Sequence, residues 1–114
     1  MAERDETFTI VDAVLVHRVV PKRGTPYQHT CDQTAYEAVA HAIDEMNGRG
    51  FTLDDLHTAT DLPWTQNAVA LAFLKERGCI VPSVRKRHVG ATRDVHCDAM
   101  IEWHALREKG GEQS

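Results

Sequence analysis

The stretch DLPWTQNAVALAFLKERGCIV, residues 61–81, decides the fold that this sequence predicts. Proline is favoured at the first position of a helix, and Pro63 stands where the stretch turns apolar. Glycine commonly follows the last turn of a helix, and Gly78 stands where the apolar run ends. The stretch therefore predicts a helix over residues 63–77.

The apolar side chains of this helix leave no wide polar stripe. Placed at 100° steps, those of residues 64–74 cover the whole circumference. A helix that is apolar all round is normally buried all round, so we expect it to pack against a second surface besides the core. The candidates for that surface are residues 8–20, the last helix of the chain, and a second protomer.

Two shorter helical segments precede this stretch. Thr34, with Glu37 three residues later, matches the reciprocal capping arrangement at a helix start and predicts a helix over residues 35–46. The same spacing recurs in FTLDDLHTATD and predicts a short helix over residues 53–59, capped by Thr52 and Asp55. A tight turn at Asp61-Leu62-Pro63 then separates this helix from the next.

The N-terminal third is less regular. The apolar positions of residues 8–20, FTIVDAVLVHRVV, fit a strand and a helix about equally well, and their many β-branched side chains favour the strand. Residues 21–33 carry two prolines, a glycine and several turn formers, which predicts a loop or arm. We therefore expect residues 1–33 to form an N-terminal strand and arm outside the main domain.

The segment CIVPSVRKRHVGATRDVHC, residues 79–97, predicts a β-hairpin whose turn is Gly-Ala-Thr. Its outgoing arm carries Arg85, Lys86 and Arg87, and its return arm begins at Arg93, so it holds the one concentrated basic patch. Asp98 is then expected to cap a last helix in AMIEWHALREK. The tail, residues 110–114, is expected to be disordered.

Composition limits the classes of protein. A chain of 114 residues is one domain long, and its net charge of −4 gives no general sign of nucleic-acid affinity. No apolar run approaches the length that spans a bilayer, and the N-terminus is too acidic for a signal peptide. We therefore expect no membrane association, a cytoplasmic location, and reduced thiols at the three cysteines.

The order helix, short helix, tight turn, helix, basic hairpin and final helix resembles the winged helix-turn-helix domains of bacterial transcriptional regulators. The resemblance rests on FTLDDLHTATDLPWTQNAVALAFLKERGCIV, where the residues that match the family pattern are Thr60, Leu62, Pro63, Leu74, Glu76, Arg77 and Gly78. It implies a mainly α fold with a small β-hairpin wing (α+β), a winged helix-turn-helix over residues 34–109.

The resemblance also implies a function, which is binding of double-stranded DNA by a small transcriptional regulator, as a homodimer. Helix 63–77 would be the recognition helix, with base-facing candidates Trp64, Thr65, Gln66 and Ala68, and with Asn67 at the edge. The wing, residues 82–95, would neutralise phosphates through Arg85, Lys86, Arg87 and Arg93. Lys75 is the only cation between residues 63 and 76.

Other interpretations stay open. The basic run of the hairpin is equally typical of a solvated strand that charge protects from aggregation. Trp64 could stack at a DNA surface, but a tryptophan just inside a helix start more often packs over a neighbouring turn. The alternative function is a winged-helix module for protein–protein interaction or dimerisation without DNA binding, which the net acidity and the apolar helix favour.

The sequence favours neither an enzyme nor a metal site. It has no Gly-rich phosphate loop, nucleophile elbow or clustered carboxylate pair, and Asp44 with Glu45 is typical of a solvated surface. The closest metal-ligand groupings are His29 with Cys31 and His96 with Cys97, and neither has the spacing of a structural zinc site. We therefore expect no cofactor and no metal. Cys79, beside two apolar residues, is expected to be buried.

Overall fold

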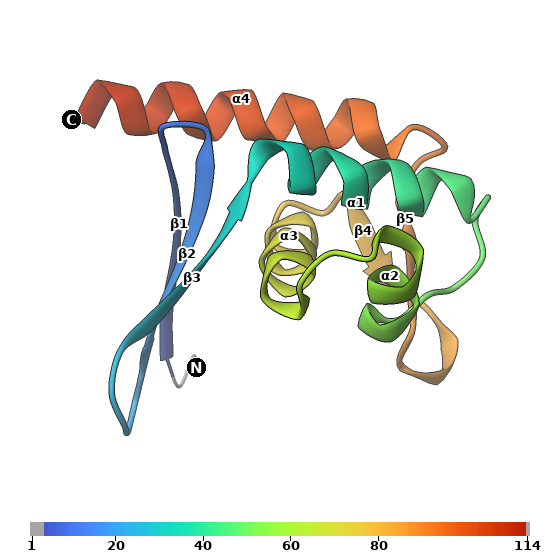
Figure 1. The fold of residues 1–114 in the computed structure, drawn as a ribbon, viewed down its shortest axis with the longest axis horizontal. Coiled ribbons are helices and arrows are strands. Elements are labelled where there is room, and N and C mark those ends of the chain that lie inside the picture. The colour runs from blue at the N-terminus through green and yellow to red at the C-terminus, as the bar shows by residue number, and fades with distance from the viewer. Residues whose placement is uncertain (1–3, 114) are drawn as a thin grey trace.

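The computed structural model describes residues 4–113, and side chains are described over residues 5–109. This part of the chain is an α+β protein with four helices and two small antiparallel sheets (Figure 1). The elements follow in the order β1 (Arg4–Val11), β2 (Val14–Pro21), β3 (Tyr27–Asp32), α1 (Gln33–Glu45), α2 (Leu53–Thr60), α3 (Trp64–Glu76), β4 (Ile80–Pro82), β5 (His88–Gly90) and α4 (Val95–Gln113).

The N-terminal region is a three-stranded sheet in the order β1-β2-β3, with antiparallel neighbours. Asp12 and Ala13 alone connect β1 to β2, at φ of 51° and 61°. Positive φ at both positions gives a two-residue turn the twist that suits a tight hairpin. The prediction of one strand over residues 8–20 is therefore wrong, and the predicted arm at 21–33 contains β3.

This sheet is the second surface that covers α3. β3 and β2 pack against α3 on one side, and α1 and α2 pack against it on the other (Figure 1). The fully buried ring of Phe73 in α3 contacts both the sheet and the helices. Its centroid lies 5.2 Å from that of Phe8 in β1 and 5.9 Å from that of Tyr36 in α1. Of the surfaces expected for this role, residues 8–20 of the same chain fill part of it, and β3, which lies outside that range, supplies the rest.

Helices α1 to α3 confirm the predicted segments within two residues at either end. The predicted capping box of α2 is present, since Thr52 N donates to Asp55 Oδ2 at 2.9 Å and Asp55 N donates to Thr52 Oγ1 at 3.2 Å. The cap of α1 was predicted wrongly. Asp32, rather than Thr34, accepts from Ala35 N at 2.8 Å, so the last residue of β3 also begins α1.

Helix α4 begins at Val95, four residues before the segment predicted to follow an Asp98 cap. Its first amides are bound from α1, because Asp44 accepts from Val95 N at 2.7 Å and from His96 N at 3.0 Å. The expectation that Asp44 is a solvated surface residue is therefore wrong. The predicted tail is helical as far as Gln113, and Ser114 lies outside the described residues. No helix within residues 4–113 is long and apolar enough to cross a membrane.

The contact between Asp44 and the start of α4 gives a test of this fold. We expect Asp44→Ala to lower the free energy of unfolding by about 1–2 kcal/mol, because two amides at a helix N-terminus lose their acceptor. Urea denaturation followed by circular dichroism measures the loss. Glu45→Ala, at the exposed neighbouring position, is the matched control and should change stability by less than about 0.5 kcal/mol. Equal losses in the two variants would contradict the assigned role of Asp44.

Candidate nucleic-acid interface

The turn between α2 and α3 is held by a buried asparagine. Asn67 is 0% exposed, and its Nδ2 donates to the carbonyl groups of Leu62 at 3.1 Å and Pro63 at 3.2 Å. Its Oδ1 accepts from the hydroxyl group of Thr60 at 3.0 Å. The prediction that Asn67 lies at the edge of a base-reading surface is wrong, because all its polar atoms are used inside the protein. Asn67 instead fixes the angle at which α3 leaves α2.

The first turn of α3 leaves only part of the predicted base-facing set accessible. Trp64 is 46% exposed and stacks on the ring of His57 in α2, with centroids 4.4 Å apart. Thr65 is exposed, whereas Gln66 and Ala68 are half-buried. Gln66 Oε1 accepts from the backbone N–H of Asp32 at 3.3 Å, which ties this side chain to the end of β3. Trp64 and Thr65 are thus the side chains of this turn that a partner meets first.

The surface beside this turn belongs to the N-terminal sheet. Gln28, His29 and Thr30 of β3 line a shallow groove together with Pro63 and Thr65. A molecule that approaches the start of α3 therefore meets β3 as well. The sequence interpretation missed this neighbour because it placed residues 21–33 in an arm.

The basic residues of the second hairpin lie at its tip rather than along its strands. β4 and β5 pair from Ile80 with Gly90 to Pro82 with His88, and the intervening turn holds Arg85 and Lys86 at φ of 57° and 61°. The predicted turn at Gly-Ala-Thr is wrong. Glycine adopts such φ values more easily than arginine or lysine, which is why a sequence-based choice favours a turn at Gly90.

The other predicted cations occupy different surroundings. Arg87 Nη1 lies 3.3 Å from Asp55 Oδ2, so this cation is partly neutralised by α2. Arg93 lies between the hairpin and α4, and Lys75 is exposed near the C-terminal end of α3, away from its first turn. The structure therefore groups Arg85, Lys86 and Arg87 together, and leaves Lys75 and Arg93 outside that group.

A second basic tip was not predicted. Lys22 and Arg23 are exposed in the connection between β2 and β3. Figure 1 shows that this connection and the β4–β5 tip both point away from α1 and α4, with α2 and α3 between them. The sequence shows these cations as Lys-Arg-Gly, residues 22–24. The side of the molecule to which this connection points follows only from the three-stranded sheet. We name the surface formed by both tips and the first turn of α3 the hairpin face.

The cysteines divide by burial. Burial, reinforced by the charge of Asp32, raises the pKa of the Cys31 thiol to about 12, and burial raises that of Cys79 to about 11. Both thiols are therefore protonated near neutral pH, and Cys79 is buried as predicted. Cys97 is exposed on α4.

One further cluster joins residues that the sequence groupings kept apart. Glu37 and His41 on α1 lie beside His96 on α4, with one potential metal-ligand atom from each residue within 4.8 Å of the others. Spacing along the chain had paired His96 with Cys97. In the sequence, the spacing of Glu37 and His41 at i and i+4 on one helix could have indicated part of this cluster. The position of His96 beside them depends on the packing of α4 against α1.

Thiol reactivity tests this division of the cysteines. We expect the native protein to react rapidly at one thiol with a chromogenic disulfide reagent, and Cys97→Ser to remove that rapid phase, because the thiolate is the nucleophile and Cys31 and Cys79 are covered. After denaturation, wild type should titrate three thiols and the variant two. A rapid phase that survives Cys97→Ser would contradict the burial of the other two.

Comparisons of this chain with protein-family models, with curated proteins and with solved structures found no match. The candidate function therefore follows from the chain's own surfaces. The hairpin face and the cluster of Glu37, His41 and His96 are the two that carry chemistry beyond packing.

Proposed function

We propose that this protein binds double-stranded DNA with its hairpin face, as a small transcriptional regulator with a winged helix-turn-helix fold. The order of α1, α2, α3 and the β4–β5 hairpin supports the fold, and so does the buried Asn67 that holds the turn between α2 and α3. In this fold β4 and β5 are the wing. The N-terminal sheet is an addition that packs beside α3.

The observation that carries the proposal is the pair of basic tips on the hairpin face. Lys22 and Arg23 are exposed at one tip, and Arg85 and Lys86 at the other, although the chain as a whole has a net charge of −4. Both tips point to the same side of the molecule (Figure 1), so a duplex laid along this face would meet both of them.

The first turn of α3 contributes less to sequence recognition than the resemblance implies. Gln66 would read adenine through its amide group, but its Oε1 is used by Asp32 N. Trp64 and Thr65 remain for contact with a base or a phosphate. Binding is then dominated by phosphate contacts, which are strongly sensitive to salt and weakly sensitive to sequence.

A homodimer remains part of the proposal with less support. The last helix offers a second copy little apolar surface, because Trp103 and Leu106 of α4 are buried within the chain. Ile101, also on α4, is 59% exposed and is the apolar side chain of this helix best placed for contact with a second copy.

Charge removal at the tips tests the DNA proposal. We expect Arg85→Gln with Lys86→Gln to lower affinity for random-sequence duplex DNA, and to reduce the slope of log K against log salt by about 1.8, because each phosphate contact contributes about 0.9. Lys22→Gln with Arg23→Gln should do the same. Fluorescence anisotropy titrations at several salt concentrations measure both quantities.

The matched control is Arg107→Gln with Lys109→Gln, which removes two exposed cations from α4 and leaves the hairpin face intact. For this control, the slope of log K against log salt should stay at least one unit steeper than for either tip variant. Equal slopes in all three variants would show that the tips make no special contact. Failure of the wild type to bind duplex at low salt would overturn the proposal and leave the protein-interaction alternative.

A further inference from the structure

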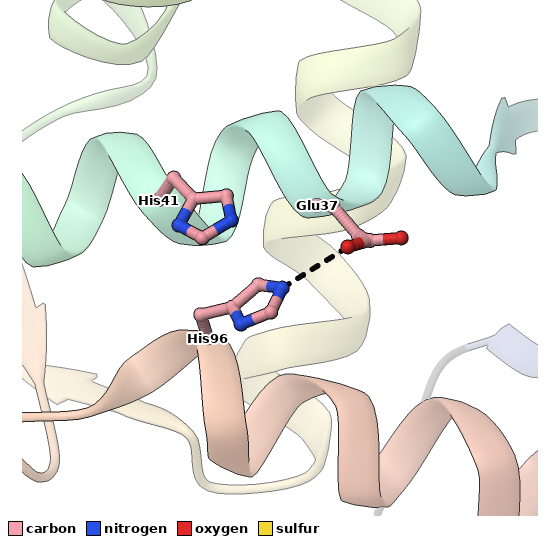
Figure 2. Close-up of side chains that lie close together, drawn as sticks. All are labelled: Glu37, His41 and His96. Atoms are coloured by element: carbon pink, nitrogen blue, oxygen red, sulfur yellow. Dashed lines mark hydrogen bonds and ion pairs between the residues drawn. The ribbon is translucent and has the colours of Figure 1, made fainter.

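The cluster of Glu37, His41 and His96 lies outside the hairpin face, between α1 and the start of α4 (Figure 2). Glu37 and His41 are one turn apart on α1, so both side chains project from the same side of that helix. His96 is the second residue of α4. The three side chains meet across the seam between the two helices.

Contacts within the cluster show that the side chains are already gathered. Glu37 Oε1 lies 3.1 Å from His96 Nε2. The rings of His41 and His96 stack with centroids 4.0 Å apart and planes 15° from parallel. One ligand atom from each of the three residues lies within 4.8 Å of the others, whereas two donors on one tetrahedral zinc ion are about 3.3 Å apart. To bind one ion, the two imidazole rings would have to rotate out of their stack, because the lone pairs of parallel rings do not converge on one point.

The backbone and the carboxylate of the cluster are held from outside it. Asp44 on α1 binds the N–H groups of Val95 and His96, which fixes the start of α4 on α1. Gln33 Nε2 donates to Glu37 Oε2 at 3.3 Å, which leaves Oε1 directed toward His96. Hydrogen bonds of this kind orient the carboxylate ligands of metal ions in proteins. Less of the binding free energy is then lost in ordering the ligands.

We infer that Glu37, His41 and His96 form a binding site for a divalent transition-metal ion of the zinc class. Two imidazole groups and one carboxylate suit zinc, cobalt or nickel, whereas magnesium and calcium favour all-oxygen ligands. Three protein ligands leave a fourth position for water, and His41 is exposed while the other two are half-buried, so the site is open to solvent. A bound ion would clamp α4 to α1. This inference stands independently of DNA binding.

Zinc titration of the whole chain of 114 residues tests the inference. After treatment with a chelator, the protein should bind one Zn²⁺ in isothermal titration calorimetry. Saturation with Zn²⁺ should raise Tm by about 5 °C or more, because the ion binds the folded chain. His41→Ala should weaken the binding at least tenfold, and it is the clearest variant because His41 is exposed on α1. Circular dichroism confirms that the variant is folded.

His96→Ala should show the same loss, and Glu37→Gln should also weaken binding, since it removes the charge and keeps the shape of the side chain. The controls are His104→Ala, at an exposed position on α4, and Cys97→Ser, which removes the thiol next to His96; both should bind Zn²⁺ as wild type does. The inference is overturned if wild type binds no Zn²⁺. It is also overturned if the loss follows Cys97 or His104 rather than His41 and His96, because the ligands would then be others.

Discussion

The rest of this structure depends on the need to cover the apolar side chains of α3 from two directions. Six side chains of this helix are buried, from Asn67 to Leu74, and at 100° per residue they span about 200° of its circumference, while Ala68 and Ala72 on the remaining side are half-buried and Lys75 is exposed. Helices α1 and α2 cover one side, and the N-terminal sheet covers the other. Phe73 joins the two layers through ring contacts with Tyr36 and Phe8. Without the sheet, part of this apolar helix would face water, at a cost of about 25 cal/mol for each Å² of apolar surface.

The elements that the sequence predicted well are those with local signals. A capping box indicated the start of α2, and Pro63 and Gly78 indicated the two ends of α3; each of these signals arises within one segment. The β1–β2 turn was missed because its two left-handed residues are Asp12 and Ala13, where sequence rules expect glycine or asparagine. The β4–β5 turn was misplaced for the same reason at Arg85 and Lys86. The start of α4 was misplaced although Asp94, directly before it, accepts from Cys97 N at 3.0 Å as a local cap; the further acceptor, Asp44, is distant in sequence.

Among the candidate site residues, too, those that depend on local signals were predicted and those that depend on tertiary contacts were not. Trp64 and Thr65 were predicted at the first turn of α3, and both are exposed there. Asn67 and Gln66 were predicted beside them, yet Asn67 binds Thr60 and Leu62 across the turn before α3, and Gln66 Oε1 accepts from the N–H of Asp32, which only the folded chain brings near. The direction of the Lys22–Arg23 tip and the meeting of His96 with Glu37 and His41 likewise depend on tertiary packing. The residue types indicated which groups could bind DNA or a metal ion. The packing of the chain decides which of their polar atoms can contact such a partner.

The dependence of α3 on a sheet formed by residues 4–32 has a consequence for synthesis on the ribosome. The sheet is made first, but α3 is complete only at residue 76, which is 44 residues after residue 32. At 5–20 residues per second, that interval lasts about 2–9 s. During it, the apolar side chains of Ile10, Leu15 and Cys31, which end in the core, lack the helix that covers them. The nascent chain is then a target for chaperones and for pairing with other unfinished chains.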